Sequence, residues 1–244
     1  MNVAGIGIIG SSGRMGQALA TAIAEAGHDV AAQVDHGDDP AKALEGCDAV
    51  VDFSSPDALE RTLAAVRELR IPILVGTTGL EDAHFAMLDN AAEVIAVLQT
   101  GNTSLGVTLL AHLVGEAAKR LGEDWDIEIL EMHHRRKVDA PSGTAKLLGE
   151  AAAHARGIDL ADNMESGRDG QTGARAQGAI GFAALRGGTV AGEHSVIFAG
   201  EEERLTLSHS AENRSIFARG AVRAAQWLIG KPAGRYTMED VLGL

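Results

Sequence analysis

The chain has 244 residues and a formal net charge of −13, with 45% hydrophobic and 3% aromatic residues. An acidic chain with so few aromatic side chains is poorly suited to nucleic acid, and we expect no nucleic-acid partner. Cys47 is the only cysteine, which excludes an intrachain disulfide and a cysteine-based metal cluster, so we expect no metal site.

The apolar runs of the chain bear on its location. No basic stretch precedes the first apolar run, so we expect no signal peptide. The run from Leu105 to Ala118 is interrupted by His112 and is shorter than the roughly 20 residues of a membrane helix. We therefore expect a soluble, cytoplasmic protein without a membrane partner.

The N-terminal region predicts a strand, a glycine-rich turn and a helix. Residues 3–9 are an apolar run, glycines recur at positions 10, 13 and 16, and residues 17–27 have a helical pattern that ends at a glycine. In this order, Gly10 permits a tight turn, Gly13 lets a phosphate approach the backbone, and Gly16 lets helix and strand pack closely. Glycine spacing alone is common, and the flanking strand and helix are what favour a dinucleotide cradle.

A second candidate strand, residues 29–34, ends at Asp35. A carboxylate about 20 residues beyond the glycines bonds the adenosine ribose hydroxyls in dinucleotide-binding folds. It also repels the 2′-phosphate of NADP, so we predict NADH as the preferred coenzyme. NADPH remains possible because a protonated His36 would partly offset that repulsion. Asp35 as a plain turn residue before Gly37 is the alternative.

The alternation of strands and helices continues to residue 104. Candidate strands lie at 49–53, 71–75 and 94–98, and candidate helices at 58–69 and 83–92. Each loop after a strand could be an ordinary turn, but ligands of open α/β sheets bind at the carboxyl ends of strands, so the repeated placement favours one shared site. The predicted cofactor-binding residues are Gly10, Ser11, Ser12, Gly13, Arg14, Met15, Asp35, Gly76, Thr77, Thr78, Thr100, Gly101, Asn102 and Thr103.

The second half of the chain predicts helices and strands in a different order. Helices are expected at about 106–121 and 142–155, with a strand at 125–132 between them. Residues 157–178 are rich in glycine and charge and predict an exposed, mobile loop. Three further strands are expected at 180–185, 193–199 and 204–209, the last two as an antiparallel hairpin, and an amphipathic helix at 215–229.

These elements predict an α/β protein of two parts. Residues 1–104 would form a Rossmann-like, parallel-sheet dinucleotide-binding domain. Residues 105–214 would form a smaller α+β domain for substrate binding and oligomerisation, with a mixed sheet open on one face and free to pair with other subunits. Residues 215–244 would be a C-terminal helix that returns to the first domain. Closure of the two domains needs hinges, expected near Ser104 and Ser215.

The segment His133–Lys137 gathers two imidazoles and three cations within five residues. The protein as a whole repels anions, so this concentrated positive charge suggests a site for a negatively charged small molecule. Ser142 to Thr144 opens the next helix, and the backbone N–H groups of a helix N-terminus bind anions. Together these features indicate an enzyme acting on a carboxylate. The alternative is a charged run that is simply solvated.

Several stretches together resemble the 4-hydroxy-tetrahydrodipicolinate reductase (dihydrodipicolinate reductase) family. They are residues 10–16, 51–54, 75–79, 131–145 and 185–195. The resemblance covers nearly the whole chain, and the segment from His133 to Thr144 is its most specific part. It implies reduction of 4-hydroxy-tetrahydrodipicolinate to tetrahydrodipicolinate by NADH or NADPH, in diaminopimelate and lysine biosynthesis, by a homotetramer.

The resemblance also implies roles for single residues. His133 would donate or accept a proton, Lys137 would be a second proton donor, and His134 with Gly143–Thr144 would hold the carboxylates of the dicarboxylate substrate. The residues themselves fit these roles, because an imidazole or an ammonium group supplies a proton near neutral pH. Cations and the N–H donors of the turn that begins at Ser142 suit two carboxylates.

Two positions depart from the family pattern. Thr103 stands where an aromatic residue is usual, which removes a ring near the cofactor but leaves backbone contacts possible. His36 stands where many members carry an arginine for the NADP phosphate, which weakens the assignment of NADPH. The sequence leaves open whether Arg135 and Arg136 touch substrate, and whether the true substrate is the hydroxylated or the dehydrated ring.

Other functions remain compatible with parts of the sequence. One is another nicotinamide-dependent oxidoreductase acting on an amino-acid diacid, of the aspartate dehydrogenase type, although such an enzyme is not expected to carry His133–Lys137. A second is a non-enzymatic dinucleotide sensor whose basic segment binds a partner. A metal-dependent hydrolase is disfavoured, because adjacent histidines in an extended chain point to opposite sides.

Overall fold

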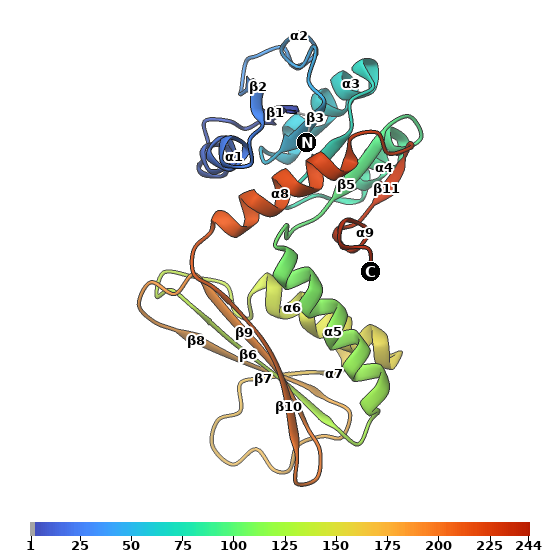
Figure 1. The fold of residues 1–244 in the computed structure, drawn as a ribbon. Helices are drawn as coiled ribbons and strands as arrows, with labels where there is room; N and C mark the ends of the chain where they lie inside the picture. The colour runs from blue at the N-terminus through green and yellow to red at the C-terminus, as the bar shows by residue number, and fades with distance from the viewer. Residues whose placement is uncertain (1–2) are drawn as a thin grey trace. The chain divides into compact units, whose positions relative to one another are not determined.

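The computed structural model describes residues 3–244, which divide into two compact units (Figure 1). Unit 1 consists of the chain up to Leu105 together with Ser215–Leu244, and unit 2 is Gly106–Arg214. Each unit has its own sheet and its own buried apolar core. The candidate residues therefore belong to two sets, one in each unit.

The sheet of unit 1 has six strands, all parallel, in the order β11-β5-β4-β3-β1-β2. The strands are β1 (Gly5–Ile9), β2 (Asp29–Val34), β3 (Ala49–Asp52), β4 (Ile73–Val75), β5 (Ala96–Gln99) and β11 (Gly234–Tyr236). Parallel strands covered on both faces are apolar along their length, and every residue of β3 and β4 is buried. The expected Rossmann-like parallel sheet is confirmed, and β11 is an edge strand that the sequence pattern does not predict.

Helices cover both faces of this sheet. They are α1 (Arg14–Glu25), α2 (Pro40–Ala43), the 3₁₀ turn η1 (Pro56–Ala58), α3 (Leu59–Leu69), α4 (Asp82–Ala92), α8 (Ser215–Leu228) and α9 (Met238–Leu242). One core contains apolar residues of α1, α8 and α9, and the other contains residues of α3 and α4. A Cβ atom on Gly220 of α8 would lie 1.8 Å from the carbonyl oxygen of Thr103, so only glycine lets α8 approach this loop.

Unit 2 contains a mixed five-stranded sheet in the order β10-β9-β6-β8-β7. Its strands are β6 (Asp126–His133), β7 (Met164–Ser166), β8 (Ile180–Arg186), β9 (Gly192–Ala199) and β10 (Arg204–Ala211). The helices are α5 (Leu105–Leu121), α6 (Gly143–Arg156) and α7 (Leu160–Asn163). Strand β6 pairs parallel with β8 and antiparallel with β9, and β9 with β10 forms the expected antiparallel hairpin. The predicted mixed sheet is therefore confirmed.

One face of this sheet packs on helices and the other is bare (Figure 1). Side chains alternate along β6, so Ile127 and Ile129 are buried against the helices while Leu130 points the other way and is 36% exposed. On the same open face, Leu185 of β8 is 48% exposed. Exposed leucines on a sheet face are a feature of surfaces that pair with another protein surface.

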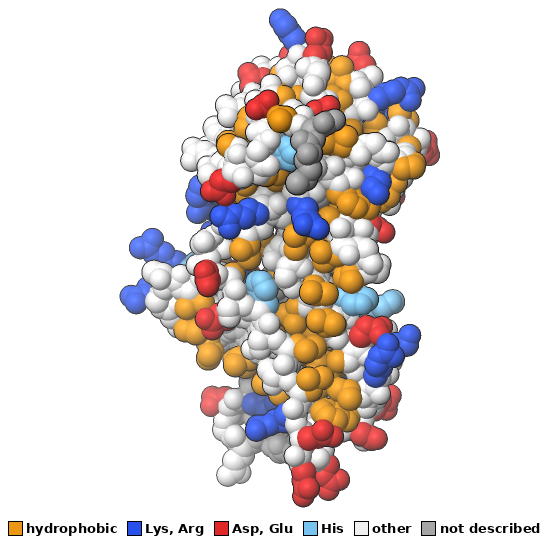
Figure 2. Space-filling model, viewed as in Figure 1, with side chains coloured by type: hydrophobic (Ala, Val, Ile, Leu, Met, Phe, Trp, Pro, Cys, Tyr) orange, Lys and Arg blue, Asp and Glu red, His pale blue; other side chains and the backbone are white. Residues whose placement is uncertain are grey.

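Helix α5 also exposes apolar side chains. Leu109 and Leu113, one turn apart, are each 43% exposed, and Figure 2 shows apolar side chains gathered along this helix. Among the described helices, none combines the length and the hydropathy that a membrane crossing requires.

The predicted exposed, mobile loop over residues 157–178 is mostly exposed, but it contains two short elements that the sequence pattern does not predict. The segment contains α7 and β7, and Arg175 anchors its later part by donating to Asp126 at 2.8 Å and to Glu128 at 2.9 Å. The strand is only three residues long and the partners of Arg175 lie far back in the sequence. A local pattern therefore carries little sign of either feature.

Candidate active site

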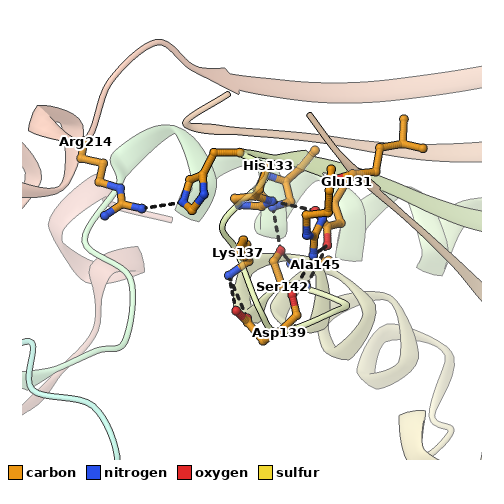
Figure 3. A network of polar contacts seen from close by, with 11 residues as sticks. Glu131, His133, Lys137, Asp139, Ser142, Ala145 and Arg214 are labelled. Carbon is orange, nitrogen blue, oxygen red and sulfur yellow. Dashed lines mark hydrogen bonds and ion pairs between the residues drawn. The ribbon is translucent and has the colours of Figure 1, made fainter. Parts of the chain in front are cut away.

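A buried carboxylate organises the polar network at the end of β6 (Figure 3). Glu131 and His133 are two residues apart in a strand, so they lie on the same face of the sheet. Oε2 of Glu131 lies 2.6 Å from Nδ1 of His133, and Arg186 of β8 donates to both carboxylate oxygens, each at 2.8 Å. The backbone N–H of Ser142 donates to Oε1 at 3.1 Å. One side chain thus joins β6, β8 and the start of α6.

The charge state of Glu131 follows from these partners. Burial of the carboxyl opposes ionisation, but the hydrogen bonds from Arg186 and His133 outweigh it and leave the pKa of Glu131 below its ordinary value. The side chain is only 1% exposed. Glu131 is therefore a buried anion that is neutralised by Arg186, and its charge is not available to solvent.

Ser142 caps helix α6 and contacts a buried histidine. Its Oγ accepts the backbone N–H of Ala145 at 3.1 Å and lies 3.0 Å from Nε2 of His194, on β9. Burial, assisted by the neighbouring His133, lowers the pKa of His194 to about 4. The rings of His133 and His194 meet edge to face with centroids 5.1 Å apart. His194 is therefore a neutral packing partner at pH 7.

The remaining candidate residues of unit 2 lie in the turn after β6 and the first turn of α6. Nζ of Lys137 lies 2.8 Å from both carboxylate oxygens of Asp139, and Nε2 of His134 lies 3.0 Å from Nη2 of Arg214. Loss of hydration and the positive charge of Arg214 lower the pKa of His134. Gly143 and Thr144 are the first two residues of α6, at the N-terminal end of the helix.

The structure therefore brings the predicted catalytic and substrate-binding residues of unit 2 into one neighbourhood (Figure 3). The side chains of Arg135 and Arg136 are exposed at its edge. Sequence reasoning assigned no role to the residues that hold this neighbourhood together, which are Glu131, Asp139, Arg186, His194 and Arg214. The one local signal was the spacing of Glu131 and His133 on one face of a strand.

The glycine loop of unit 1 is closely packed. Gly10 has a φ of +81°, and a Cβ atom there would lie 2.6 Å from the carbonyl oxygen of Phe53. A Cβ atom on Gly16 would lie 2.3 Å from the carbonyl oxygen of Gly10. Arg14 and Met15, predicted as loop residues before a helix at 17, already form the first turn of α1. A tight glycine turn leading directly into a helix N-terminus fits a pyrophosphate.

Asp35 is tied to this loop. Its carboxylate accepts hydrogen bonds from Ser11 Oγ at 2.6 Å, Ser12 Oγ at 2.9 Å and the backbone N–H of Ser12 at 3.1 Å. The hydrogen bond from Ser11, together with those from Ser12, lowers the pKa of Asp35. Asp35 therefore does more than end β2 in a turn, because it holds an ionised carboxylate beside the glycine loop.

The loops after β3, β4 and β5 lie at the same edge of the sheet. The buried carboxylate of Asp52 accepts from Ser54 Oγ at 2.6 Å and from Thr77 Oγ1 at 3.1 Å, and burial raises its pKa against the effect of these hydrogen bonds. A Cβ atom on Gly101 would lie 4.0 Å from Cγ2 of Thr78, so the loops of β4 and β5 are neighbours. The candidate cofactor residues of unit 1 thus cluster at the carboxyl ends of adjacent strands.

Three of these loop residues have engaged side chains or buried surroundings. Thr100 Oγ1 accepts the backbone N–H of Asn102 at 3.1 Å, which closes a tight turn. Thr103 is buried, and its Oγ1 donates to the carbonyl oxygen of Phe217 in α8 at 2.7 Å. A Cβ atom on Gly76 would lie 2.2 Å from the ring of Phe53, so glycine lets this ring pack against the loop. Thr103 therefore anchors the loop to α8.

The described residues contain no group of three or more His, Cys, Asp or Glu side chains arranged to hold a metal ion.

Two family models match consecutive parts of the chain. The model "Dihydrodipicolinate reductase, N-terminus" matches residues 4–103, and the model "Dihydrodipicolinate reductase, C-terminus" matches residues 106–242. The first match falls within unit 1, and the second spans unit 2 and most of the C-terminal part of unit 1.

Curated relatives agree with these matches. A 4-hydroxy-tetrahydrodipicolinate reductase of Methylocella silvestris is 58% identical over 206 residues, which cover 84% of this chain and 76% of the relative. One of Caulobacter vibrioides is 50% identical over 252 residues, covering 98% of this chain and 96% of the relative.

Solved structures share the fold. A dipicolinate-bound dihydrodipicolinate reductase from Paenisporosarcina sp. TG-14 has a TM-score of 0.77 at 23% identity, covering 97% of this chain and 98% of that chain. A probable dehydrogenase from Thermotoga maritima has a TM-score of 0.64 at 12% identity, with coverage of 97% and 92%. At these identities the likeness is one of architecture.

Proposed function

This chain belongs to the dihydrodipicolinate reductase family, and from that premise we propose how its own residues perform the reaction. It is an NAD(P)H-dependent oxidoreductase that reduces 4-hydroxy-tetrahydrodipicolinate to tetrahydrodipicolinate in diaminopimelate and lysine biosynthesis. The observation that carries the assignment of residues is the carboxylate of Glu131, which binds both the imidazole of His133 and the first turn of α6.

Unit 1 holds the coenzyme, which supplies the hydride when bound. The closely packed turn at Gly10 and Gly16 presents backbone N–H groups to a pyrophosphate at the start of α1. The loops after β4 and β5 are adjacent and form the rest of the proposed binding surface. Its proposed residues are Gly10–Met15, Asp35, Gly76–Thr78 and Thr100–Thr103.

NADH is the proposed preferred coenzyme. Asp35 stays ionised because the hydroxyls of Ser11 and Ser12 donate to it, and an ionised carboxylate beside the adenosine ribose repels a 2′-phosphate. His36 is exposed on the same turn and carries positive charge only when protonated, so NADPH is accepted less well.

Unit 2 holds the dicarboxylate substrate. The backbone N–H groups of Gly143 and Thr144 point from the N-terminus of a 14-residue helix, where the helix dipole favours negative charge. Ser142 fixes this first turn by capping it and by donating its own N–H to Glu131. His134 lies beside the cation of Arg214, and together they suit a carboxylate.

His133 and Lys137 are the proposed proton donors. The overall reaction adds one hydride and one proton to the ring. The hydroxyl group leaves as water by taking up a second proton, while the ring gives up one proton from carbon, so two protons are delivered to the substrate and one is removed. His133 exchanges a proton at its imidazole, and Lys137 supplies a second one from Nζ, which Asp139 positions at 2.8 Å. Glu131 and Asp139 thus each orient one proton donor.

The open sheet face is the proposed oligomer interface, and the proposed assembly is a homotetramer. Leu130 and Leu185 are exposed on this face, which no described helix of unit 2 covers. The proposed location is the cytoplasm, where a biosynthetic enzyme draws on reduced coenzyme.

Steady-state reduction of freshly made 4-hydroxy-tetrahydrodipicolinate tests the assignment directly. Oxidation of NADH and NADPH is followed separately by the loss of nicotinamide absorbance, with coenzyme alone as the blank. The expected result is turnover with both and a higher kcat/KM with NADH. No oxidation of either coenzyme would overturn the reductase assignment, and a higher kcat/KM with NADPH would overturn the proposed preference alone.

A further inference from the structure

The carboxylate of Glu131 has a full set of hydrogen-bond donors. Oε1 accepts from Arg186 Nη2 at 2.8 Å and from the backbone N–H of Ser142 at 3.1 Å. Oε2 accepts from Arg186 Nη1 at 2.8 Å and faces Nδ1 of His133 at 2.6 Å. A carboxylate has about four lone-pair positions, and here each has a partner.

An ionised carboxylate only accepts hydrogen bonds, which decides where the proton of the imidazole lies. The hydrogen bonds from Arg186 keep Glu131 ionised, and burial keeps the carboxylate away from water. The short contact to His133 is therefore a hydrogen bond only if Nδ1 carries the hydrogen. The neutral ring then has its lone pair on Nε2.

The surroundings of Nε2 agree with that arrangement. Among the described residues, Nε2 of His133 has no hydrogen-bond partner, in contrast to Nδ1. Position 192 on the neighbouring strand is glycine, and a Cβ atom there would lie 3.1 Å from Nε2. The edge of His194 packs against the ring and restricts its rotation. The imidazole is thus held at one nitrogen and left uncrowded at the other.

We propose that Glu131 is a positioning residue that fixes the tautomer of His133, with hydrogen on Nδ1, so that Nε2 exchanges the proton with substrate. The inference rests on the proposed function, because it assigns the reacting atom of a proposed proton donor. Glu131 also binds the backbone N–H of Ser142. The same carboxylate therefore sets both the proton-carrying nitrogen and the start of the helix that binds the substrate carboxylates.

Glu128 provides a matched control on the same strand. It forms ion pairs with Arg168 and Arg175 at 2.9 Å, so it is also a carboxylate held by arginine. It lies three residues before Glu131 in β6, and because side chains alternate along a strand it points to the opposite face of the sheet. Glu128→Gln removes a similar charge without touching an imidazole.

The test combines two measurements. One is the ring ¹⁵N chemical shifts of His133, which are assigned by comparison with His133→Gln, and the other is kcat on 4-hydroxy-tetrahydrodipicolinate. At a pH where the ring is neutral, the wild type should carry the hydrogen on Nδ1. In Glu131→Gln the amide N–H₂ donates to Nδ1 and moves the hydrogen to Nε2, and kcat should fall about 100-fold or more. Glu131→Asp keeps a carboxylate and should keep the Nδ1–H tautomer. Glu128→Gln should change neither quantity.

Three results would overturn the proposal. One is a wild-type ring with its hydrogen on Nε2, which needs no variant to fold. The second is Glu131→Gln with an altered tautomer and unchanged kcat. The third is Glu131→Gln with a lowered melting temperature and an unchanged tautomer, which would indicate a purely structural role. If wild type oxidises neither coenzyme, the proposed function fails, whereas the tautomer measurement still decides the role of Glu131.

Discussion

The hydroxyl of Ser142 lies 3.0 Å from Nε2 of His194, and both side chains are buried. Ser142 Oγ also accepts the backbone N–H of Ala145. Burial lowers the pKa of His194 to about 4, so the ring is neutral at pH 7. The contact joins β9 to the N-terminus of α6.

A pH dependence of stability follows from His194. The unfolded ring titrates near its ordinary pKa of 6.5 and the folded ring near 4, so the unfolded state binds the proton more tightly between these values. Stability should fall as the pH decreases from 6.5 to 4, by about 3 kcal/mol in all at about 1.4 kcal/mol per pH unit. Denaturant unfolding across this range measures the slope.

His194→Gln should flatten that slope, because Gln keeps an acceptor for Ser142 but does not titrate. Some slope should remain, since burial also lowers the pKa of His209. His36→Gln, at an exposed position, serves as the control and should keep the wild-type slope. An unchanged slope in His194→Gln would show that this histidine does not control acid stability.

Asp35 should determine the coenzyme preference. Asp35→Asn removes the charge but keeps one acceptor oxygen, and its amide N–H₂ can donate to the other serine hydroxyl, so the contacts with Ser11 and Ser12 are retained. The kcat/KM ratio of NADPH to NADH should rise about tenfold, which corresponds to about 1.4 kcal/mol of relieved repulsion. Asp38→Asn changes a nearby carboxylate that binds the backbone N–H of Asp35, and should leave the ratio as it is. An equal kcat/KM ratio of NADPH to NADH in the wild type, Asp35→Asn and Asp38→Asn would show that Asp35 does not determine the coenzyme preference.

Gly220 should tolerate no side chain. In Gly220→Ala the new Cβ would lie 1.8 Å from the carbonyl oxygen of Thr103, so α8 or the loop must move. We expect a loss of about 3 kcal/mol in the free energy of unfolding and weaker coenzyme binding, measured by denaturant titration and by NADH fluorescence. Gly115→Ala in α5 is the control, since its Cβ would lie 3.6 Å from the nearest atom. A stable Gly220→Ala with normal NADH affinity would contradict this packing.

Leu185 should contribute to the assembly. The side chain is 48% exposed on the open sheet face, so Leu185→Asp places a charge where another subunit would pack. Light scattering should give a tetramer mass for the wild type and a smaller mass for the variant. Leu113→Asp, on α5 with 43% exposure, should remain tetrameric. A monomeric wild type would contradict the proposed assembly. A tetrameric Leu185→Asp together with a dissociated Leu113→Asp would place the interface on α5.

Local sequence patterns predict most of unit 1 because its central strands β1, β3, β4 and β5 are apolar and largely buried. Strand β2 occupies the predicted residues 29–34, and α3 ends at the predicted Leu69. Strand β11 was not predicted, because Gly234–Tyr236 has neither length nor alternation and depends on pairing with the edge of β5. Short strands that are stabilised by pairing with residues distant in the sequence are not predicted by local sequence patterns.

The same distinction applies to the candidate site. His133, Lys137 and Ser142 occur within ten residues of one another and are recognisable as a basic segment before a helix. Arg186 neutralises Glu131 from a strand 55 residues further along, and His194 reaches Ser142 across 52 residues. Pairing of β6 with β8 and β9 creates these contacts, so they follow from sheet topology and are not visible in local spacing.

His133 and Lys137 are proposed to deliver the protons of the reaction while unit 1 binds the coenzyme. The most direct measurement is kcat on 4-hydroxy-tetrahydrodipicolinate, together with the Kd for NADH, in His133→Ala, Lys137→Ala and the control Lys146→Ala, an exposed cation of α6. We expect kcat to fall about 100-fold or more in the first two proteins, with the Kd for NADH unchanged in all three. Wild-type kcat in His133→Ala or Lys137→Ala would contradict this proposal.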